Sequence, residues 1–196
     1  VREAVRHAVE SGQDYDIEFR YRTKDDAERW MLGRGRSFYD ENGKPYRLAG
    51  LGLDITERKQ AEMASRRLAA IVESSDDAII GKDLNGVVTG WNSGAERLYG
   101  YTAEEMIGKE ITLLIPKERP DEEPAILARL RRGEIIDHYE TVRVTKDERR
   151  LDVSLTVAPI TDASGKVIGA SNIARDITQK KRAETERHLL QMREHA

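Results

Sequence analysis

Cysteine is absent from all 196 residues of the chain. Its absence excludes a disulfide framework, a thiolate nucleophile, cysteine-ligated zinc and any cofactor attached through a thioether or thioester. It also fits a reducing compartment. No run of residues approaches the ~20 apolar positions that span a bilayer, and no signal peptide is visible. We therefore expect a cytoplasmic protein whose residues in this segment make no membrane contact.

A strong charge of one sign is missing as well. Lys and Arg total 33 and Asp and Glu total 36, which leaves a net charge of -3. No basic stripe with aromatic neighbours occurs, so we expect no nucleic-acid partner. The histidines show no metal-ligand spacing, so we expect no metal site. No Gly-rich phosphate loop and no Ser/His/Asp set is found, so we assign no catalytic residue.

One nine-residue pattern occurs twice. "DITERKQAE" occupies residues 54–62 and "DITQKKRAE" occupies residues 176–184, 122 positions later. The same offset aligns Glu18 with Glu140, and it aligns the Thr-Lys-Asp and Gly-Lys segments that follow them. Constant spacing predicts two copies of one unit of about 120 residues, the first without its front half. Since the chain begins at a valine and ends in a helical pattern, we interpret it as a piece of a longer protein.

The half that both copies share reads as strands. Residues 151–157 alternate between apolar and polar side chains, which is typical of a strand with one buried face. Turn sequences at 42–44 and 164–166 predict short antiparallel connections. In the second copy, residues 77–83 and 86–92 add two strands, and three short helices follow. The pattern predicts an α+β fold, a five-stranded antiparallel sheet with helices packed on one face.

A helix is predicted after each repeated pattern, with Thr56 and Thr178 as its caps. In the first of these helices, one stripe has heptad a/d spacing and consists of Ala61, Ala64, Leu68 and Ile71. Two interpretations stay open. The helix either rests on its own domain or forms a short parallel coiled coil with a second protomer, helped by neighbouring domains because two heptads are too weak alone.

Residues 70–184 resemble a PAS domain with its carboxyl-terminal PAC motif. The resemblance rests on "SSDDAIIGKDLNGVVTGWNSGAERLYGYTAEEMIGKEITLLIP" and on "HYETVRVTKDERRLDVSLTVAPITDASGKVIGASNIARDITQKKRAE". Residues 1–62 resemble the back half of a preceding PAS domain, including an Arg-Trp pair at positions 29 and 30. The resemblance implies the strand order 2-1-5-4-3. The expected parts are a truncated domain (1–55), a linker helix (56–73), a complete PAS/PAC domain (74–178) and an outgoing helix (179–196).

That strand order has a consequence for the truncated copy. Its final strand, at about residues 45–54, lacks the neighbour that the complete copy supplies, so it would be an unpaired edge with an uncovered apolar face. We expect residues 1–55 to be either poorly ordered or completed by another chain.

The family resemblance also allows cofactors to be considered. Cysteinyl-flavin and coumaric-acid types need a cysteine, and haem types place a histidine on the helix after "LIP", where this chain has Glu122 or Glu123. We expect none of these cofactors, while an unknown small ligand stays open. Pocket candidates are Tyr139, Thr141, Leu155 and Val157. A competing register of the third strand would turn Val142 and Val144 inward instead.

The remaining charged residues, histidines and tryptophans are interpreted as structural rather than functional. Arg129, Arg131 and Arg132, with the acidic residues at 121–123, are interpreted as compensating charges on a solvated helix face. His138 is interpreted as a partly exposed strand residue, with pH sensing or ligand binding as the alternative. His188 and His195 lack the context of a phosphoacceptor. Trp30 and Trp91 are expected to pack rather than to stack on a ligand.

The resemblance implies a sensory and dimerisation module within a bacterial signalling protein. Asp54, Thr56, Asp176 and Thr178 would join each sheet to its outgoing helix and transmit the signal. The parent protein would be a two-component sensor histidine kinase and a homodimer through linker helices and PAS surfaces. The alternatives are a cyclic-dinucleotide cyclase or phosphodiesterase, and a structural spacer without a ligand.

Overall fold

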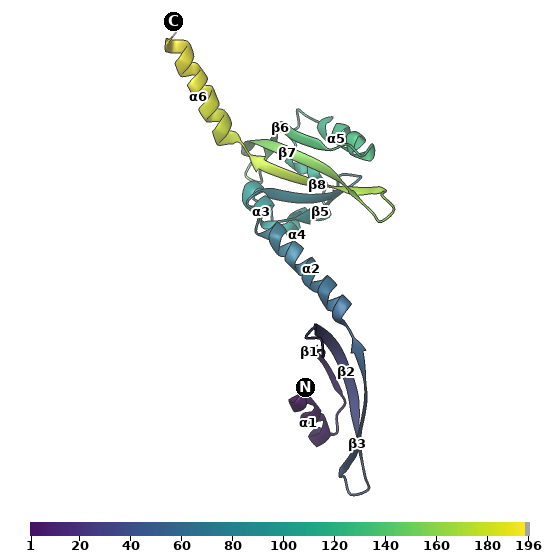
Figure 1. The fold of residues 1–196 in the computed structure, drawn as a ribbon. Helices are drawn as coiled ribbons and strands as arrows, with labels where there is room; N and C mark the ends of the chain where they lie inside the picture. Colours follow the sequence, from purple (N-terminus) through teal and green to yellow (C-terminus); the bar gives the residue numbers. More distant parts are fainter. Residues whose placement is uncertain (195–196) are drawn as a thin grey trace. The chain divides into compact units, whose positions relative to one another are not determined.

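The computed structural model describes residues 1–194 and divides the chain into two compact units (Figure 1). The first unit is Val1–Leu68, and the second begins at Ala69. His195 lies outside the described residues. Within the part of the chain that the structure describes, no helix is both long and apolar enough to cross a lipid bilayer.

The first unit is a helix followed by a three-stranded antiparallel sheet in the order β1-β2-β3. Its elements are α1 (Arg2–Ser11), β1 (Tyr15–Arg22), β2 (Glu28–Tyr39) and β3 (Pro45–Asp54). The Tyr39 hydroxyl donates to the carbonyls of Ala8 and Val9, at 3.2 and 2.6 Å. This contact fastens α1 to the sheet, beside which it lies in Figure 1.

Strand β3 is an edge of this sheet, as the sequence predicts. Four of its large apolar side chains are exposed: Tyr46, Leu48, Leu51 and Leu53. A free edge with uncovered apolar residues invites pairing with another strand. Completion of the unit by another chain stays a prediction.

Helix α2 runs from Thr56 to Glu73 without a Gly or Pro and buries none of its residues. Leu68 and Ile71 of the predicted stripe are exposed. The stripe is therefore exposed in the part of the chain that the structure describes, and its pairing with a second protomer stays a prediction.

The second unit contains a five-stranded antiparallel sheet in the order β5-β4-β8-β7-β6. Counted within the unit, this is 2-1-5-4-3, so the predicted order is confirmed. The strands are β4 (Ala78–Asp83), β5 (Val88–Trp91), β6 (Ile136–Val144), β7 (Arg150–Thr161) and β8 (Val167–Asp176). The helices are α3 (Ser93–Tyr99), α4 (Ala103–Met106), the 3-10 turn η1 (Ile111–Leu114), α5 (Glu122–Arg131) and α6 (Thr178–Glu194).

The hydrophobic core lies between the inner face of this sheet and the helices. Alternation along β7 places Leu151, Val153, Leu155 and Val157 in the core, as predicted. The helices contribute Tyr99, Met106, Leu114, Ile126, Leu127 and Leu130. Trp91 also packs in the core, and its indole N–H donates to the Tyr101 carbonyl at 3.0 Å.

Side-chain caps mark the first residues of the short helices α3 and α4. Asn92 caps α3 by accepting the Ala95 N–H, and Thr102 forms a capping box with Glu105 at the start of α4. The Asn92 amide also donates to the carbonyl of Val72 at 2.8 Å, which fixes the end of α2 to the second unit. These caps satisfy backbone groups that a short helix would otherwise leave unpaired.

Candidate functional site

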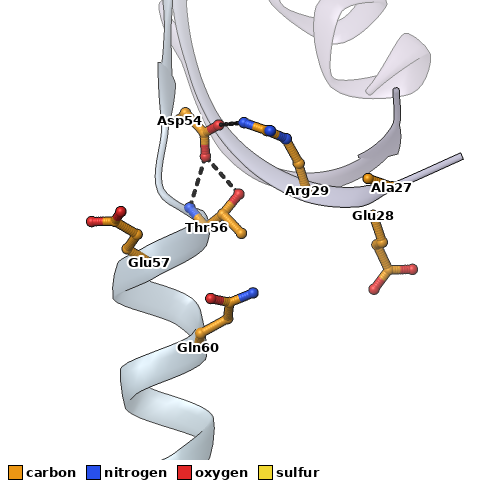
Figure 2. A pocket seen from close by; sticks show the side chains of 7 residues that line it. All are labelled: Ala27, Glu28, Arg29, Asp54, Thr56, Glu57 and Gln60. Carbon is orange, nitrogen blue, oxygen red and sulfur yellow. Dashed lines mark hydrogen bonds and ion pairs between the residues drawn. The ribbon is translucent and has the colours of Figure 1, made fainter. Parts of the chain in front are cut away.

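The first candidate site is the joint between β3 and α2 (Figure 2). Asp54 Oδ1 accepts the Thr56 N–H at 2.9 Å and the Thr56 hydroxyl at 2.5 Å. Its second oxygen, Oδ2, accepts from Arg29 Nη1 at 3.1 Å. One carboxylate at the end of the last strand thus fixes the first residue of the helix.

The Thr56 side chain does not cap the helix as predicted. Its Oγ1 accepts the backbone N–H of Trp30 on β2 at 2.9 Å, and the Ile55 N–H donates to the Trp30 carbonyl at 2.9 Å. The helix begins at Thr56 itself. The threonine therefore ties the start of the helix to the neighbouring strand, while Asp54 supplies the acceptor that a cap would supply.

The second unit repeats these contacts at the start of α6. The Thr178 N–H donates to Asp176 Oδ1 at 2.8 Å, and Thr178 Oγ1 accepts the Asp152 N–H of β7 at 3.0 Å. The Ile177 N–H donates to the Asp152 carbonyl at 2.9 Å. Each of these residues stands 122 positions after its counterpart in the first joint. The structure thus brings together all four residues that the sequence proposes for signal transmission, in two pairs.

A third contact of each joint was missed from the sequence. Lys59 Nζ lies 2.5 Å from Glu18 Oε2 on β1, and Lys181 Nζ lies 3.0 Å from Glu140 Oε2 on β6. The offset of 122 aligns both partners of this pair. That coincidence is a usable signal, because two residues that recur together in both copies are candidates for contact. Each helix is thereby held to three neighbouring strands.

The two joints differ in the ion pair made by the aspartate. Arg29, which pairs with Asp54, corresponds to Leu151 in the second unit. An open pocket of about 580 Å³ lies at the first joint (Figure 2). It is lined by Ala27, Glu28, Arg29, Asp54, Thr56, Glu57 and Gln60. The lining is polar and solvated, so the site is built for hydrogen bonding rather than for holding an apolar ligand.

The electrostatics of the joints favour the charged forms of their residues. The hydroxyl and N–H of Thr56, followed by Arg29, lower the pKa of Asp54 below its ordinary 3.8. Lys59 lowers the pKa of Glu18, and Glu18 in turn raises the pKa of Lys59. Glu140 raises the pKa of Lys181. All four groups are therefore ionised near neutral pH.

The four pocket candidates occupy different environments. Thr141 is 3% exposed, and Leu155 and Val157 lie in the core, whereas Tyr139 is 36% exposed. A β-bulge between Ile136 and Tyr139 interrupts the strand pairing there. The burial of Thr141 shows that its face of β6, and not that of Val142, turns inward.

The interpretation of the acidic residues on α5 as a solvated face is wrong. Glu122 and Glu123 are buried, and Arg129 and Arg132 pair with Glu134 instead. The first turn of α5 places both carboxylates in the layer between this helix and the sheet, where they meet residues of β4 and β6. Buried carboxylates need positively charged partners.

The positively charged partners are side chains of two different strands, β4 and β6, on the inner face of the sheet. Lys82 Nζ of β4 lies 2.5 Å from Glu123 Oε1. Arg143 Nη2 of β6 lies 2.6 Å from Glu122 Oε1. Thr141 donates its hydroxyl to Glu122 Oε2 at 2.7 Å. Burial is the largest influence on Lys82 and lowers its pKa, while Glu123 acts in the opposite direction.

One sequence signal could have revealed this cluster. Strand alternation places Lys82 on the same face as Ala78 and Ile80, which is the core face of β4. A lysine on a core face requires a buried carboxylate. The acidic residues on α5 were the available partners, but the pairing distance of 41 residues gives no local pattern.

His138 is more exposed than the partly exposed residue that the sequence predicts. It lies beside the β-bulge with a positive φ of 47°, and 3.6 Å separates its Nε2 from Asp137 Oδ2. Its side chain is exposed on the sheet face away from the core, in a small pocket with Asp77 and Arg175. No metal-binding group of three or more His, Asp or Glu occurs within the described residues.

Comparisons with known proteins identify both units. Residues 66–177 match a family model described as the PAS fold, and residues 1–51 match a second model with the same description. A domain of a sensory box sensor histidine kinase/response regulator from Geobacter sulfurreducens has a TM-score of 0.51 and 25% identity. The match covers 59% of this chain and 96% of that domain.

Two relatives match much of the chain. Sensor protein FixL of Bradyrhizobium diazoefficiens is 32% identical over 135 residues, which are 67% of this chain and 27% of that protein. The probable diguanylate cyclase DgcE of Escherichia coli is 25% identical over 186 residues, 91% of this chain and 17% of that protein. The chain thus spans about a quarter or less of the length of these relatives.

Proposed function

The chain belongs to the PAS-fold family, and on that premise we propose that it passes a change in its sheet to the helix that follows. The observation that supports this function is the repeated joint. In both units the first turn of the outgoing helix contacts three adjacent strands through an aspartate, a threonine and a lysine. A spacer that only connects domains would not need the same three contacts twice.

The mechanism is mechanical. In the second unit, α6 is held to β8 by Asp176, to β7 by Thr178 and to β6 by Lys181. A ligand or partner that changes the twist of the sheet moves these three anchors by different amounts. The helix then tilts or rotates, and this biases an output that has two states.

The parent protein is proposed to be a sensor histidine kinase. The description of the Geobacter sulfurreducens domain supports this output. A diguanylate cyclase is the second candidate, because the DgcE match extends over 91% of the chain and so includes both units. The gene sequence downstream of the codon for Ala196 would distinguish the two. A His-Glu-Leu-Arg-like stretch would indicate a kinase, and a Gly-Gly-Asp-Glu-Phe-like stretch would indicate a cyclase.

A homodimer is the proposed assembly. The heptad stripe of α2 is exposed in this chain, and its spacing suits a parallel partner helix from a second copy. The cytoplasmic location expected from the sequence stays a prediction.

The joint is tested by Asp176→Ala and Thr178→Val in the full-length protein. Either change frees one anchor of α6, so we expect the output activity to change by about fivefold or more. Asp162→Ala is the matched control, because Asp162 also accepts an N–H two residues ahead, at 2.8 Å, but in the β7–β8 turn. An unchanged activity in both joint variants, or an equal change in the control, would contradict the proposal.

A further inference from the structure

The buried cluster on the inner face of the second unit contains a carboxylate held like a bound ligand. Glu122 Oε2 accepts the Thr141 hydroxyl at 2.7 Å and lies 3.5 Å from Arg119 Nη1. Glu122 Oε1 lies 2.6 Å from Arg143 Nη2. Two guanidinium groups and a hydroxyl around one carboxylate form the donor set that proteins use to recognise carboxylates.

Glu122 leaves part of the hydrogen-bonding capacity of these donors unused. Although Arg143 Nη2 is close, Glu122 Oε1 has no correctly directed hydrogen bond, so the contact is an ion pair without aligned N–H groups. Both side chains are only 5% exposed, where an unsatisfied acceptor is costly. A carboxylate without a tether can rotate into the plane of the guanidinium and accept two N–H groups.

A second buried acceptor lies on the same face of the sheet. Asn172 on β8 is buried, and its Oδ1 has no hydrogen-bond partner. Alternation along β8 turns its side chain to the same side as Ala170 and Ala174, toward α5. This amide oxygen needs a donor, so a ligand carboxylate cannot satisfy it, and only a further hydroxyl or N–H group of the ligand could.

The cluster also has a route from solvent. The Arg119 side chain is 45% exposed and donates to Thr141 Oγ1 at 2.9 Å, so it lies between solvent and Glu122. Glu122 is the first residue of α5, and Asp121 before it makes no side-chain capping bond. Moving Glu122 aside breaks its contacts with Arg143 and Thr141, which an incoming carboxylate would replace, and disturbs the backbone only at the start of one helix.

We propose that Arg119, Thr141 and Arg143 form a binding site for a small organic carboxylate, which Glu122 occupies from within until the free carboxylate displaces it. The site stands on its own geometry. Only its use as the stimulus that moves α6 rests on the proposed function.

The test uses the chain 1–196, with propionate as the probe and propionamide as the uncharged control. In ¹H–¹⁵N spectra of the wild-type chain, propionate should give saturable shifts at Thr141 and at the Arg143 side chain, and propionamide or equal sodium chloride should not. In Glu122→Gln the internal competitor is gone, so the apparent Kd for propionate should fall about tenfold or more. Arg143→Met should abolish the shifts.

The outcomes separate the site from the proposed function. Absence of saturable shifts in the wild-type chain overturns the site, as does equal affinity for propionate in the wild-type and Arg143→Met chains. Where Glu122→Gln does not fold, the comparison of the wild-type and Arg143→Met chains decides alone. Saturable binding that leaves amide exchange at the start of α6 unchanged would support the site and contradict its use as the stimulus.

Discussion

At the scale of single residues, each joint depends on groups that hold one charge state and one geometry. A short side chain such as Asp reaches a backbone N–H two residues ahead, and a Thr hydroxyl can accept from a neighbouring strand at the same time. The sequence shows which residues recur, but it does not show that the hydroxyl turns to the strand instead of the helix. Both geometries are open to a Thr at a helix start, so only the packing of the strand selects one.

Asp54 should titrate below the ordinary aspartate pKa of 3.8, because the Thr56 groups and Arg29 stabilise its charged form. Its contribution to stability is therefore present above 3.8 and lost as the pH falls through the lowered pKa. An NMR titration of the carboxyl carbons measures this pKa. In Thr56→Val the loss of the hydroxyl should raise it toward the ordinary value. A wild-type value at or above 3.8 would contradict the hydrogen bonding described.

Lys82 and Glu123 should stabilise the fold only as a pair. Lys82→Met leaves a buried carboxylate without its counter-ion, so we expect a loss of about 3–5 kcal/mol in the free energy of unfolding. The double variant Lys82→Met/Glu123→Leu should recover most of that loss. Urea unfolding followed by Trp91 fluorescence in a Trp30→Phe background measures both.

The control for this pair is Arg175→Met, which breaks an exposed contact with Asp77. It should cost at most about 1 kcal/mol. A double variant as unstable as Lys82→Met alone would show that the pair is not the source of the effect.

At the scale of elements, the alternation of apolar and polar residues was sufficient to predict the strands of the sheet. The absence of Gly and Pro was sufficient to predict the linker helix. The carboxylates of α5 were not predicted, because Glu122 and Glu123 stand among charged residues that suggest a solvated surface. Their partners lie on β4 and β6, and only the assembled sheet brings these strands to one helix end. Long-range ion pairs of this kind leave no period in the sequence.

The heptad stripe of α2 predicts a dimer contact. Leu68→Glu places a charge in the seam and should shift the chain 1–196 from dimer to monomer, as measured by light scattering coupled to size exclusion. Arg66→Glu is the control, since position 66 lies on the opposite side of the heptad. A wild-type monomer, or equal dissociation in both variants, would contradict a dimer through this helix.

At the scale of the whole molecule, the internal repeat was the main basis for predicting two units with matching strands and outgoing helices. Strands β2 and β7 begin and end 122 positions apart, as do β3 and β8, and α2 and α6 begin at the same offset. Strand order could be expected from the family resemblance, and the structure confirms it. What the sequence could not supply is which carboxylates pair with Lys82 and Arg143 on the inner face, since that depends on how α5 meets the sheet.

A double-mutant cycle between Glu122→Gln, on the inner face, and Thr178→Val, at the joint, tests whether the state of the sheet reaches the outgoing helix. These residues share no hydrogen-bond or ion-pair partner among the contacts described. Hydrogen exchange of the amides in the first turn of α6 gives the opening free energy for each chain. If the sheet relays its state to the helix, the two changes should couple by about 0.5 kcal/mol or more, whereas independent sites add within that limit. Additive effects would contradict the relay.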